Sequence, residues 1–217
     1  MSPEAGPSDA ALSSAAAWVE RFAVLRPPVS TAGAAVTIVL RDGSAGVEAL
    51  LIERASNPDD PASGEVALPG GRVDESDGSL ATTALRELRE EVGLGAADLS
   101  GPLRFVSAVP APRFRLHVGV FAGVLSRTAS PPTIGSPQEV AHVFWLPRSA
   151  LTESRLVTED SGRRVAASVH NGHVVWGFTR RVLREFFSLP TEDAADGPVL
   201  PARADREPDR TLPSRPG

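Results

Sequence analysis

"LPGGRVDESDGSLATTALRELREEVGL", residues 68–94, contains two adjacent glycines, a polar linker and a dense group of charges. Glu87, Glu90 and Glu91 are three and four positions apart. In a helix that turns about 100° per residue they share one face, within an arc of roughly 100°. Apolar residues recur at helical spacing on the far side: Ala81, Leu85, Leu88 and Val92. The stretch therefore predicts an amphipathic helix from Leu80 that ends at a glycine cap, Gly93, with its acidic face pointing away from the packed face.

The three glutamates need a reason, because like charges at positions i and i+4 destabilise a helix by a few tenths of a kcal/mol. A solvated acidic face is the simpler interpretation of such a cluster. Arg86 and Arg89 point at different angles, however, and cannot neutralise the whole face. Hard divalent cations bind several carboxylate oxygens at once. The pattern therefore favours a magnesium or manganese site on this helix.

Strand and helix patterns surround this stretch. Two apolar runs, 34–40 and 47–54, are separated by an Asp-Gly turn signal and predict a hairpin. Further strands are predicted at 103–109, 115–125 and 139–146. Apolar residues at helical spacing predict a lead-in helix over 9–25 and a final helix over 174–189. The lead-in stripe consists of Leu12, Ala15, Ala16, Val19 and Phe22, and the final one of Val175, Phe178, Val182, Leu183 and Phe186. Strands outnumber helices, which predicts an α+β sandwich.

Composition restricts the class of protein. The length of 217 residues suits one domain, which we place at 11–189, with disordered ends at 1–10 and 190–217. A formal net charge of −5 lacks the basic excess of a dedicated nucleic-acid binder. The chain has no cysteine, and no apolar run approaches the ~18 residues that a membrane span needs. We expect a cytoplasmic monomer or homodimer without nucleic-acid or membrane partners.

Residues 86–94 resemble the signature of the Nudix hydrolases at each position of its second half. That half consists of Arg-Glu, an aliphatic residue, any residue, Glu-Glu, any residue, Gly and an aliphatic residue. The first half departs from the usual pattern. Gly78 stands eight residues before Arg86, where the signature has a glutamate, and the spacer from Gly71 to Arg86 is one residue longer.

The lengthened spacer is similar to that of the coenzyme A pyrophosphatase branch of this family. Its form is Gly-Gly, two residues, Asp, two residues, Asp, five residues and Thr-Ala-Leu-Arg-Glu, which Asp74, Asp77 and 83–87 reproduce. An upstream motif matches at Leu50, Leu51, Arg54, Ala55 and Gly64, while Leu68 replaces a phenylalanine. The loop at 56–63 departs from the branch, because Asp59 and Asp60 stand near an expected arginine. Carboxylates there are expected to repel a phosphorylated ribose.

The resemblance implies a Nudix-type α/β/α sandwich with a mixed central sheet. It also implies water attack on a diphosphate bond with Mg²⁺ or Mn²⁺ as cofactor. The small-molecule substrate would be coenzyme A or a thioester, giving 3',5'-ADP and (acyl-)phosphopantetheine. Two alternatives stay open. One is another nucleoside diphosphate derivative, such as ADP-ribose, a dinucleotide or a nucleoside triphosphate, and the other is a binding module without turnover.

The resemblance also assigns roles to individual residues. Arg86 would orient the carboxylates through an ion pair with Asp74 or Asp77. Glu87 and Glu139 are alternative bases for activating water. Arg54 and Gly71 are the expected substrate-binding residues, with a structural ion pair as the alternative for Arg54. The implied metal ligands are the main-chain carbonyl of Gly70 and the carboxylates of Glu87, Glu90 and Glu91.

Simpler interpretations suit the histidines and tryptophans. His117 and His142 fit strand patterns, and His170 and His173 flank an Asn-Gly turn, where we expect them to be exposed. All three tryptophans stand among apolar residues, which favours packing over binding a base: Trp18, Trp145 and Trp176.

Overall fold

The computed structural model describes residues 12–23, 32–58, 60, 62–159, 162–190 and 199–201. Its helices are α1 (Ala15–Glu20), α2 (Leu80–Val92) and α3 (Gly177–Phe186), with short 3₁₀ turns η2 (Ala96–Asp98), η3 (Pro112–Phe114) and η4 (Arg148–Leu151). Its strands are β1 (Ala32–Gly43), β2 (Gly46–Arg54), β3 (Val66–Ala67), β4 (Gly70–Arg72), β5 (Arg104–Ala111), β6 (Leu116–Val124), β7 (Val140–Pro147), β8 (Arg155–Thr158), β9 (Arg164–His170), β10 (His173–Trp176) and β11 (Val199–Pro201).

The larger sheet is mixed, as predicted, and β1 is at its centre. Strand β6 pairs in parallel with one edge of β1, while β2 and β4 pair antiparallel with it. Strand β5 extends the sheet beyond β6, and β7 extends it beyond β2. The predicted hairpin and the three predicted later strands are therefore neighbours in one sheet.

The hairpin strands β1 and β2 diverge, and residues 66–72 lie between them. The two strands pair only from Leu40–Ala49 to Gly43–Gly46. Farther along, β4 pairs with the free edge of β1, and β3 pairs with the free edge of β2. The Thr37 amide also donates to the Pro69 carbonyl at 2.8 Å. The Gly70-Gly71 pair is thus built into the middle of the sheet.

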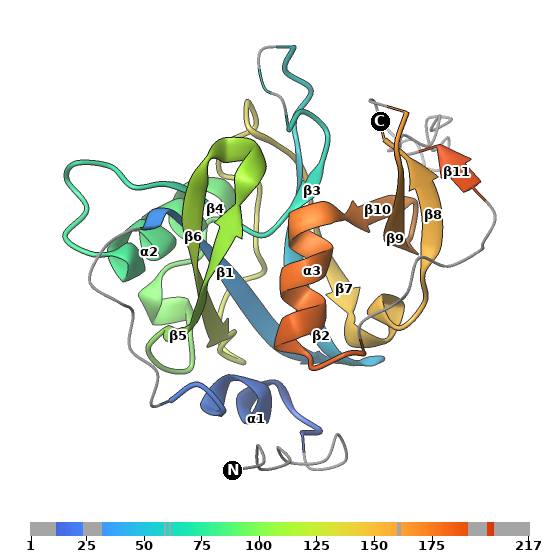
Figure 1. Ribbon diagram of the computed structural model, residues 1–217. Helices are drawn as coiled ribbons and strands as arrows, with labels where there is room; N and C mark the ends of the chain where they lie inside the picture. Colours follow the sequence, from blue (N-terminus) through green and yellow to red (C-terminus); the bar gives the residue numbers. More distant parts are fainter. Residues whose placement is uncertain are drawn as a thin grey trace, which may run out of the picture.

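Alternating side chains of β1 and β2 form two cores, one on each face of the sheet. Helices α2 and α3 lie on either side of these strands (Figure 1). Ile38 and Leu51 pack with α1 and α3. Val39 and Leu50 point to the other face and pack with α2. Helices therefore cover both faces, and the main body is the α/β/α sandwich that the resemblance implies.

A second, smaller sheet contains β8, β9, β10 and β11, and apart from the Asn-Gly turn it was not predicted. Asn171 and Gly172 have φ of 49° and 79° and form the two-residue turn between β9 and β10, a geometry that Asn-Gly favours. The predicted helix over 174–189 begins only at Gly177, because the preceding residues are strand β10. Val175 therefore belongs to a strand.

His173 joins the two sheets, which corrects the expectation that it is exposed. Its ring stacks on Phe144 of β7 with centroids 3.8 Å apart. Its Nδ1 lies 2.8 Å from Oε2 of Glu53 in β2, and its side chain is only 14% exposed. His117 and His142 lie in strands, as predicted.

Helix α1 is shorter than predicted, because the Ser14 hydroxyl caps its start by accepting from the Ala17 amide at 3.3 Å. Trp18 is buried and packs edge-on against Phe187, as expected. Ala16 is exposed, so its assignment to the apolar stripe is wrong. Trp145 and Trp176 are half-buried instead of central to the core.

The chain ends lie largely outside the described residues, including 1–11, 191–198 and 202–217. Within the range predicted to be a disordered tail, Val199–Pro201 forms β11 and pairs in parallel with β8. No helix within the described ranges is long and apolar enough to cross a membrane.

Candidate active site

Helix α2 forms where its sequence predicts. The Ser79 hydroxyl accepts from the Thr82 amide at 3.1 Å and caps the first turn. Gly93 adopts the left-handed conformation, with φ of 71°, and ends the helix. Leu88 and Val92 are fully buried on the side that faces the sheet. The apolar face thus fixes the rotation of the helix and the direction of its glutamates.

Glu91 is buried, so the acidic face is not wholly turned away from the packed face. Its side chain lies beneath the Gly70-Gly71 turn, and Oε2 accepts from the Gly70 amide at 2.8 Å. Burial raises the pKa of the Glu91 carboxyl to about 8. The residue is only 2% exposed. Glu91 therefore holds a carboxyl group that water does not stabilise, in contact with the main chain of the turn.

Gly70 and Gly71 allow the main chain to approach both the sheet and the helix. A Cβ on Gly70, which has φ of 150°, would lie 2.2 Å from the Ala35 carbonyl oxygen. A Cβ on Gly71 would lie 2.5 Å from Oε1 of Glu87. Burial also raises the pKa of the Glu87 carboxyl. Two carboxyl groups with raised pKa values therefore meet one glycine turn.

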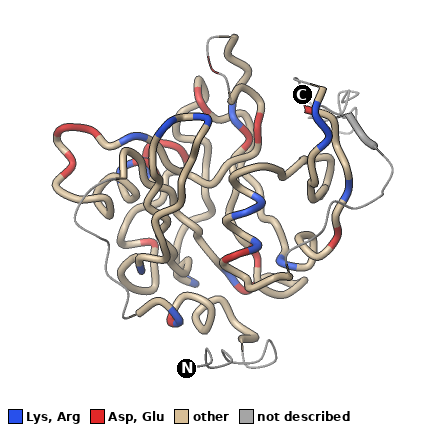
Figure 2. The backbone as a smooth tube through the Cα atoms, viewed as in Figure 1, with Lys and Arg blue, Asp and Glu red and all other residues tan. Residues whose placement is uncertain are grey.

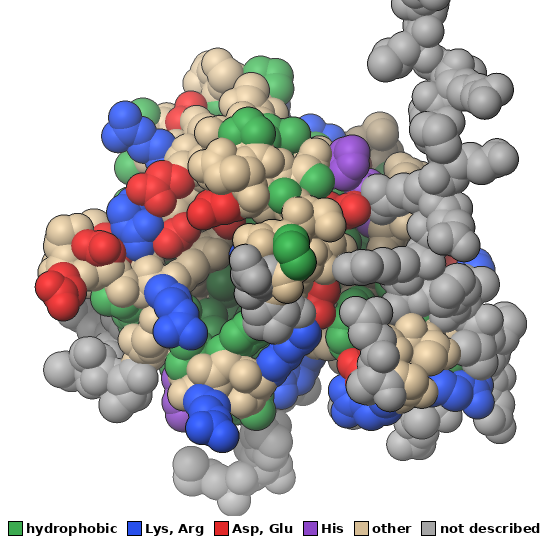
Figure 3. All heavy atoms as spheres, turned by 90° about the horizontal axis from the view of Figure 1, so that it is seen from above, with side chains coloured by type: hydrophobic (Ala, Val, Ile, Leu, Met, Phe, Trp, Pro, Cys, Tyr) green, Lys and Arg blue, Asp and Glu red, His purple; other side chains and the backbone are tan. Residues whose placement is uncertain are grey.

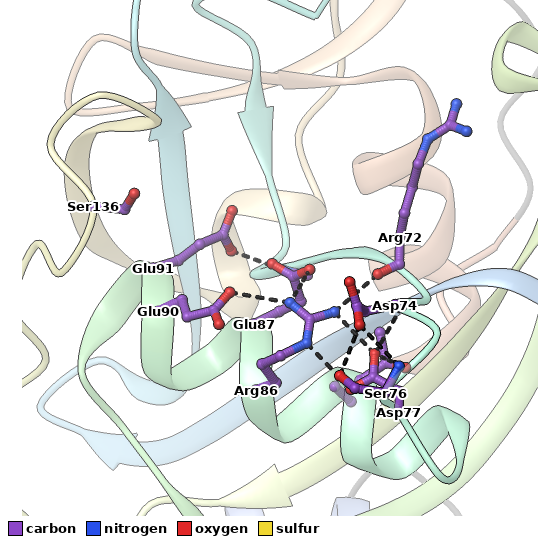
Figure 4. A network of polar contacts seen from close by, with 12 residues as sticks. Arg72, Asp74, Ser76, Asp77, Arg86, Glu87, Glu90, Glu91 and Ser136 are labelled. Atoms are coloured by element: carbon purple, nitrogen blue, oxygen red, sulfur yellow. Dashed lines mark hydrogen bonds and ion pairs between the residues drawn. The ribbon is translucent and has the colours of Figure 1, made fainter.

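Arg86 organises the surrounding acids (Figure 4). Its guanidinium binds both carboxylate oxygens of Asp77, through Nη2 at 2.9 Å and Nε at 3.2 Å. Nη1 donates to Glu87 at 2.8 Å and to Glu90 at 3.0 Å. Nη2 also donates to the Arg72 carbonyl at 2.9 Å. One arginine thus ties the helix, the glycine turn and the linker together.

Asp77 is the partner of Arg86, whereas Asp74, the other predicted candidate, accepts from Ser76. The hydrogen bond from Arg86 is the main reason why the pKa of Asp77 lies well below its usual range. Asp77 also accepts from the Thr83 hydroxyl at 2.9 Å. The longer spacer therefore places the Asp77 carboxylate beside Arg86. Gly78, at the position of the usual glutamate, has no side chain to bind it.

Glu90 and Glu139 lie at the edge of this group. The Glu90 side chain is 54% exposed and pairs with Arg86. Glu139 follows the loop after β6 and accepts from the Ser136 hydroxyl at 3.2 Å. After burial, the main cause, the charge of Glu139 also contributes to the raised pKa values of Glu87 and Glu91. The structure thus brings Glu139 to the predicted centre.

Arg54 forms the ion pair that was one of its two predicted roles. Its Nη2 lies 2.8 Å from Oδ2 of Asp60, so Asp60 does not present the uncompensated charge that the sequence suggested. Asp59 lies outside the described residues. The positive charge of Arg54 also acts on Glu91. It lowers the pKa of Glu91, against the larger effect of burial. Arg54 therefore lies between the 56–63 loop and the buried carboxylates.

Charged residues are distributed unevenly over the fold. Acids cluster in the loop before α2, whereas several basic residues lie along α3, which packs on the opposite face of the sheet (Figure 2). Seen from above, acidic side chains gather beside arginines on one part of the face (Figure 3). At the site itself, Arg86 binds Glu87 and Glu90, and the charge of Arg54 acts on Glu91.

Known proteins share this sequence pattern. The family model described as NUDIX domain matches residues 31–167. Proteins named "Uncharacterized Nudix hydrolase NudL" from Cronobacter sakazakii and Enterobacter sp. are 36% and 37% identical to this chain over 182 residues. The matches cover 77% of this chain and 90% of each relative. The chain belongs to the Nudix hydrolases. A solved NUDIX hydrolase from Alicyclobacillus acidocaldarius is similar at 22% identity with a TM-score of 0.48, covering 75% of this chain and 93% of that one.

The Nudix helix offers only part of a complete site for a divalent cation. Among the described residues, no group of three or more His, Cys, Asp or Glu side chains lies in position to hold a metal ion. Glu87 and Glu91 nevertheless suit one, because they offer hard oxygen donors and a bound cation would stabilise their ionised forms, which burial disfavours. Glu90 is bound to Arg86 and would have to turn. The pair Glu87 and Glu91 therefore fits a cation, with Glu90 as a third ligand only after rearrangement.

One part of the Nudix site was not predicted, namely the loop that closes the end of α2. The Gly135 amide donates to the Glu91 carbonyl, and the Thr133 amide donates to the Val92 carbonyl, both at 3.0 Å. A Cβ on Gly135 would lie 2.3 Å from the Glu90 carbonyl oxygen. The only signal in the sequence was the turn-forming Gly135-Ser136-Pro137, which does not reveal a distant partner.

Proposed function

We propose that this Nudix hydrolase cleaves the diphosphate bond of coenzyme A or its thioesters in the cytoplasm, with Mg²⁺ or Mn²⁺. The products would be 3',5'-ADP and (acyl-)phosphopantetheine. One observation carries the proposal: two carboxyl groups with raised pKa values, Glu87 and Glu91, meet at the Gly70-Gly71 turn. A divalent cation bound there would neutralise charge on the diphosphate and favour attack by water.

The chain's own residues would position this chemistry. Arg86 holds Glu87 through a 2.8 Å hydrogen bond and is itself fixed by Asp77. Glu139 is our proposed base, because its carboxylate is not bound by Arg86 and its charge acts on both buried glutamates. Glu87 is the alternative base. Its contact with Arg86 favours a ligand role instead.

The spacer supports the choice of coenzyme A. Its extra length and its second aspartate are the features that the coenzyme A branch shares with this chain. In the structure that aspartate, Asp77, is the bidentate partner of Arg86. The matching upstream residues Leu50, Leu51 and Arg54 lie in β2, which reaches the site at Arg54.

The deciding experiment is a substrate panel followed by product analysis. Wild-type protein and Glu91→Gln would be incubated with Mg²⁺ or Mn²⁺ and coenzyme A, acetyl-coenzyme A, ADP-ribose, a dinucleotide or a nucleoside triphosphate. We expect chromatography to show 3',5'-ADP from the coenzyme A substrates with the wild type only. Faster turnover of another substrate would show that coenzyme A is not the preferred substrate. The assignment of the protein as a diphosphatase would remain. Binding without turnover of any substrate would favour a binding module.

A further inference from the structure

A groove of about 1070 Å³ is lined by Arg54 and Ser56, the two neighbours of Ala55, whose amide donates to the Glu139 carbonyl at 2.8 Å. One wall is formed by Arg54 and the loop that follows β2, and another by η3 with Arg113 and Phe114. The start of α3 contributes Phe178 and Arg181. Because Arg54, Ser56 and Ala141 line the groove next to Glu139, a substrate whose diphosphate lies at the carboxylates can extend into the groove.

Most charged side chains that line the groove have a partner of opposite sign. These pairs are Glu53 with His173 at 2.8 Å, Glu65 with Arg113 at 2.6 Å, Glu159 with Arg163 at 2.7 Å and Arg54 with Asp60 at 2.8 Å. Each acid on the lining is thus matched by a base. The three pairs that contain an arginine leave little net charge on their parts of the wall.

Arg181 differs from the other basic residues of the lining. It is exposed, and its Nη2 donates to a neutral acceptor, the Pro110 carbonyl, at 2.7 Å. Its guanidinium carbon lies 5.8 Å from the centre of the Phe178 ring. A guanidinium has five N–H donors and stays charged at all relevant pH values. Arg181 is therefore held in place by a carbonyl and a ring while its positive charge is presented to the groove.

We propose that Arg181 binds a phosphate monoester carried by the substrate at a distance from the scissile diphosphate. This inference rests on the proposed function. It assigns to Arg181 the preference for a nucleotide that carries an additional phosphate. Arg181 brings a positive charge from α3 to the groove that Arg54 lines from the end of β2. A guanidinium is suited to a phosphate because two of its N–H groups can bind two oxygens.

The test compares ligands that differ by one phosphate. Binding of 3',5'-ADP, 5'-AMP and inorganic phosphate would be measured by calorimetry for the wild type, Arg181→Gln and Arg181→Lys. Arg163→Gln is the matched control, because Arg163 lines the same groove but is paired with Glu159. We expect the wild type and the control to prefer 3',5'-ADP over 5'-AMP. Arg181→Gln should lose about tenfold of this preference, about 1.4 kcal/mol, and Arg181→Lys should keep part of it.

Kinetics give a second measurement. Arg181→Gln should raise KM for coenzyme A without changing kcat, and should leave KM for the analogue lacking the 3'-phosphate unchanged. The inference is wrong if Arg181→Gln affects both ligands equally or neither, provided its melting curve is like that of the wild type. It is also wrong if inorganic phosphate competes as well as 3',5'-ADP. If no coenzyme A substrate is hydrolysed, the proposed function fails, while the binding preference still tests Arg181.

Discussion

Glu91 is as buried as a core leucine and yet is an acid, which makes its protonation the most informative property of the site. Its carboxyl group has a pKa of about 8 in the folded chain, compared with 4.5 in an unfolded one, chiefly because of burial. The folded state therefore binds this proton more tightly. The resulting stabilisation is complete below pH 4.5 and is lost as the pH rises through 8.

This titration predicts a pH-dependent difference between the wild type and Glu91→Gln. In chelator, the wild type should lose thermal stability relative to Glu91→Gln between pH 5 and pH 9, because the amide has no charge to bury. Adding Mn²⁺ at pH 8 should raise the melting temperature of the wild type and not that of the variant. Parallel pH profiles, or an equal response to Mn²⁺, would contradict the placement of Glu91.

Removal of single carboxylates should distinguish the contribution of Glu91 to turnover from that of Glu90. Glu91→Gln should lower kcat by orders of magnitude while keeping the circular dichroism of the wild type, since volume is nearly unchanged. Glu90→Gln should cost less, because the Glu90 side chain is 54% exposed and is bound to Arg86. Steady-state kinetics on both variants with the best substrate of the panel measures this order. Near wild-type rates for both would exclude the helix as the catalytic centre.

The sequence predicted where the acidic residues lie on α2 better than it predicted their partners. Helical spacing placed three glutamates on one face, but only the fold shows that Glu91 lies under Gly70 and that Glu90 belongs to Arg86. Asp74 and Asp77 were equal candidates for Arg86, because linker conformation decides between them. The ion pair of Arg54 with Asp60 was likewise only one of two alternatives, since the path of an irregular loop is not periodic.

The glycine turn between β3 and α2 is the element on which the site depends, and Gly70→Ala tests it. A Cβ there would meet the Ala35 carbonyl oxygen and, at 2.6 Å, the Val36 Cα. Both are backbone atoms of the central strand and cannot move aside. We expect loss of activity and a melting temperature lower by several degrees.

Gly78→Ala is the control for this substitution. Gly78 lies two residues before Leu80, and a Cβ on it would have no neighbour within 4 Å. Stability should change by no more than about 0.5 kcal/mol, as for an ordinary surface position. If the two alanine variants have equal melting temperatures and rates, the turn is not constrained as described.

Elements with long hydrophobic periodicity were predictable, and short or irregular ones were not. Strands β1, β2, β5, β6 and β7 and helix α2 were expected near their observed positions. Strands β3 and β4 contain two and three residues and pair through their main chains, so they have no side-chain pattern. The error at 174–189 has another cause, because the apolar residues of β10 continue directly into the stripe of α3.

In the molecule as a whole, His173 contacts Phe144, His142 and Glu53 of the larger sheet, and it is the residue to change. His173→Ala would remove its stack on Phe144 and leave Glu53 without its 2.8 Å partner. We expect a loss of stability on the order of 1–2 kcal/mol. His170→Ala is the matched control, because His170 lies opposite His173 in the hairpin. Among the described residues, the side-chain hydrogen bond of His170 is to its neighbour Asn171. Chemical denaturation measures both, and equal losses would refute this role for His173.

The parallel pairing of β1 with β6 has a consequence for how the protein is made. It joins residue 34 to residue 118, and both the glycine turn and the acidic helix lie in the intervening chain. Pairings between such distant residues form slowly, since a long segment must be ordered first. During synthesis, a nascent chain that ends before residue 116 already carries the whole signature but lacks the strand that completes one edge of β1. The sheet on which the acidic helix packs is therefore complete only after β6 has left the ribosome.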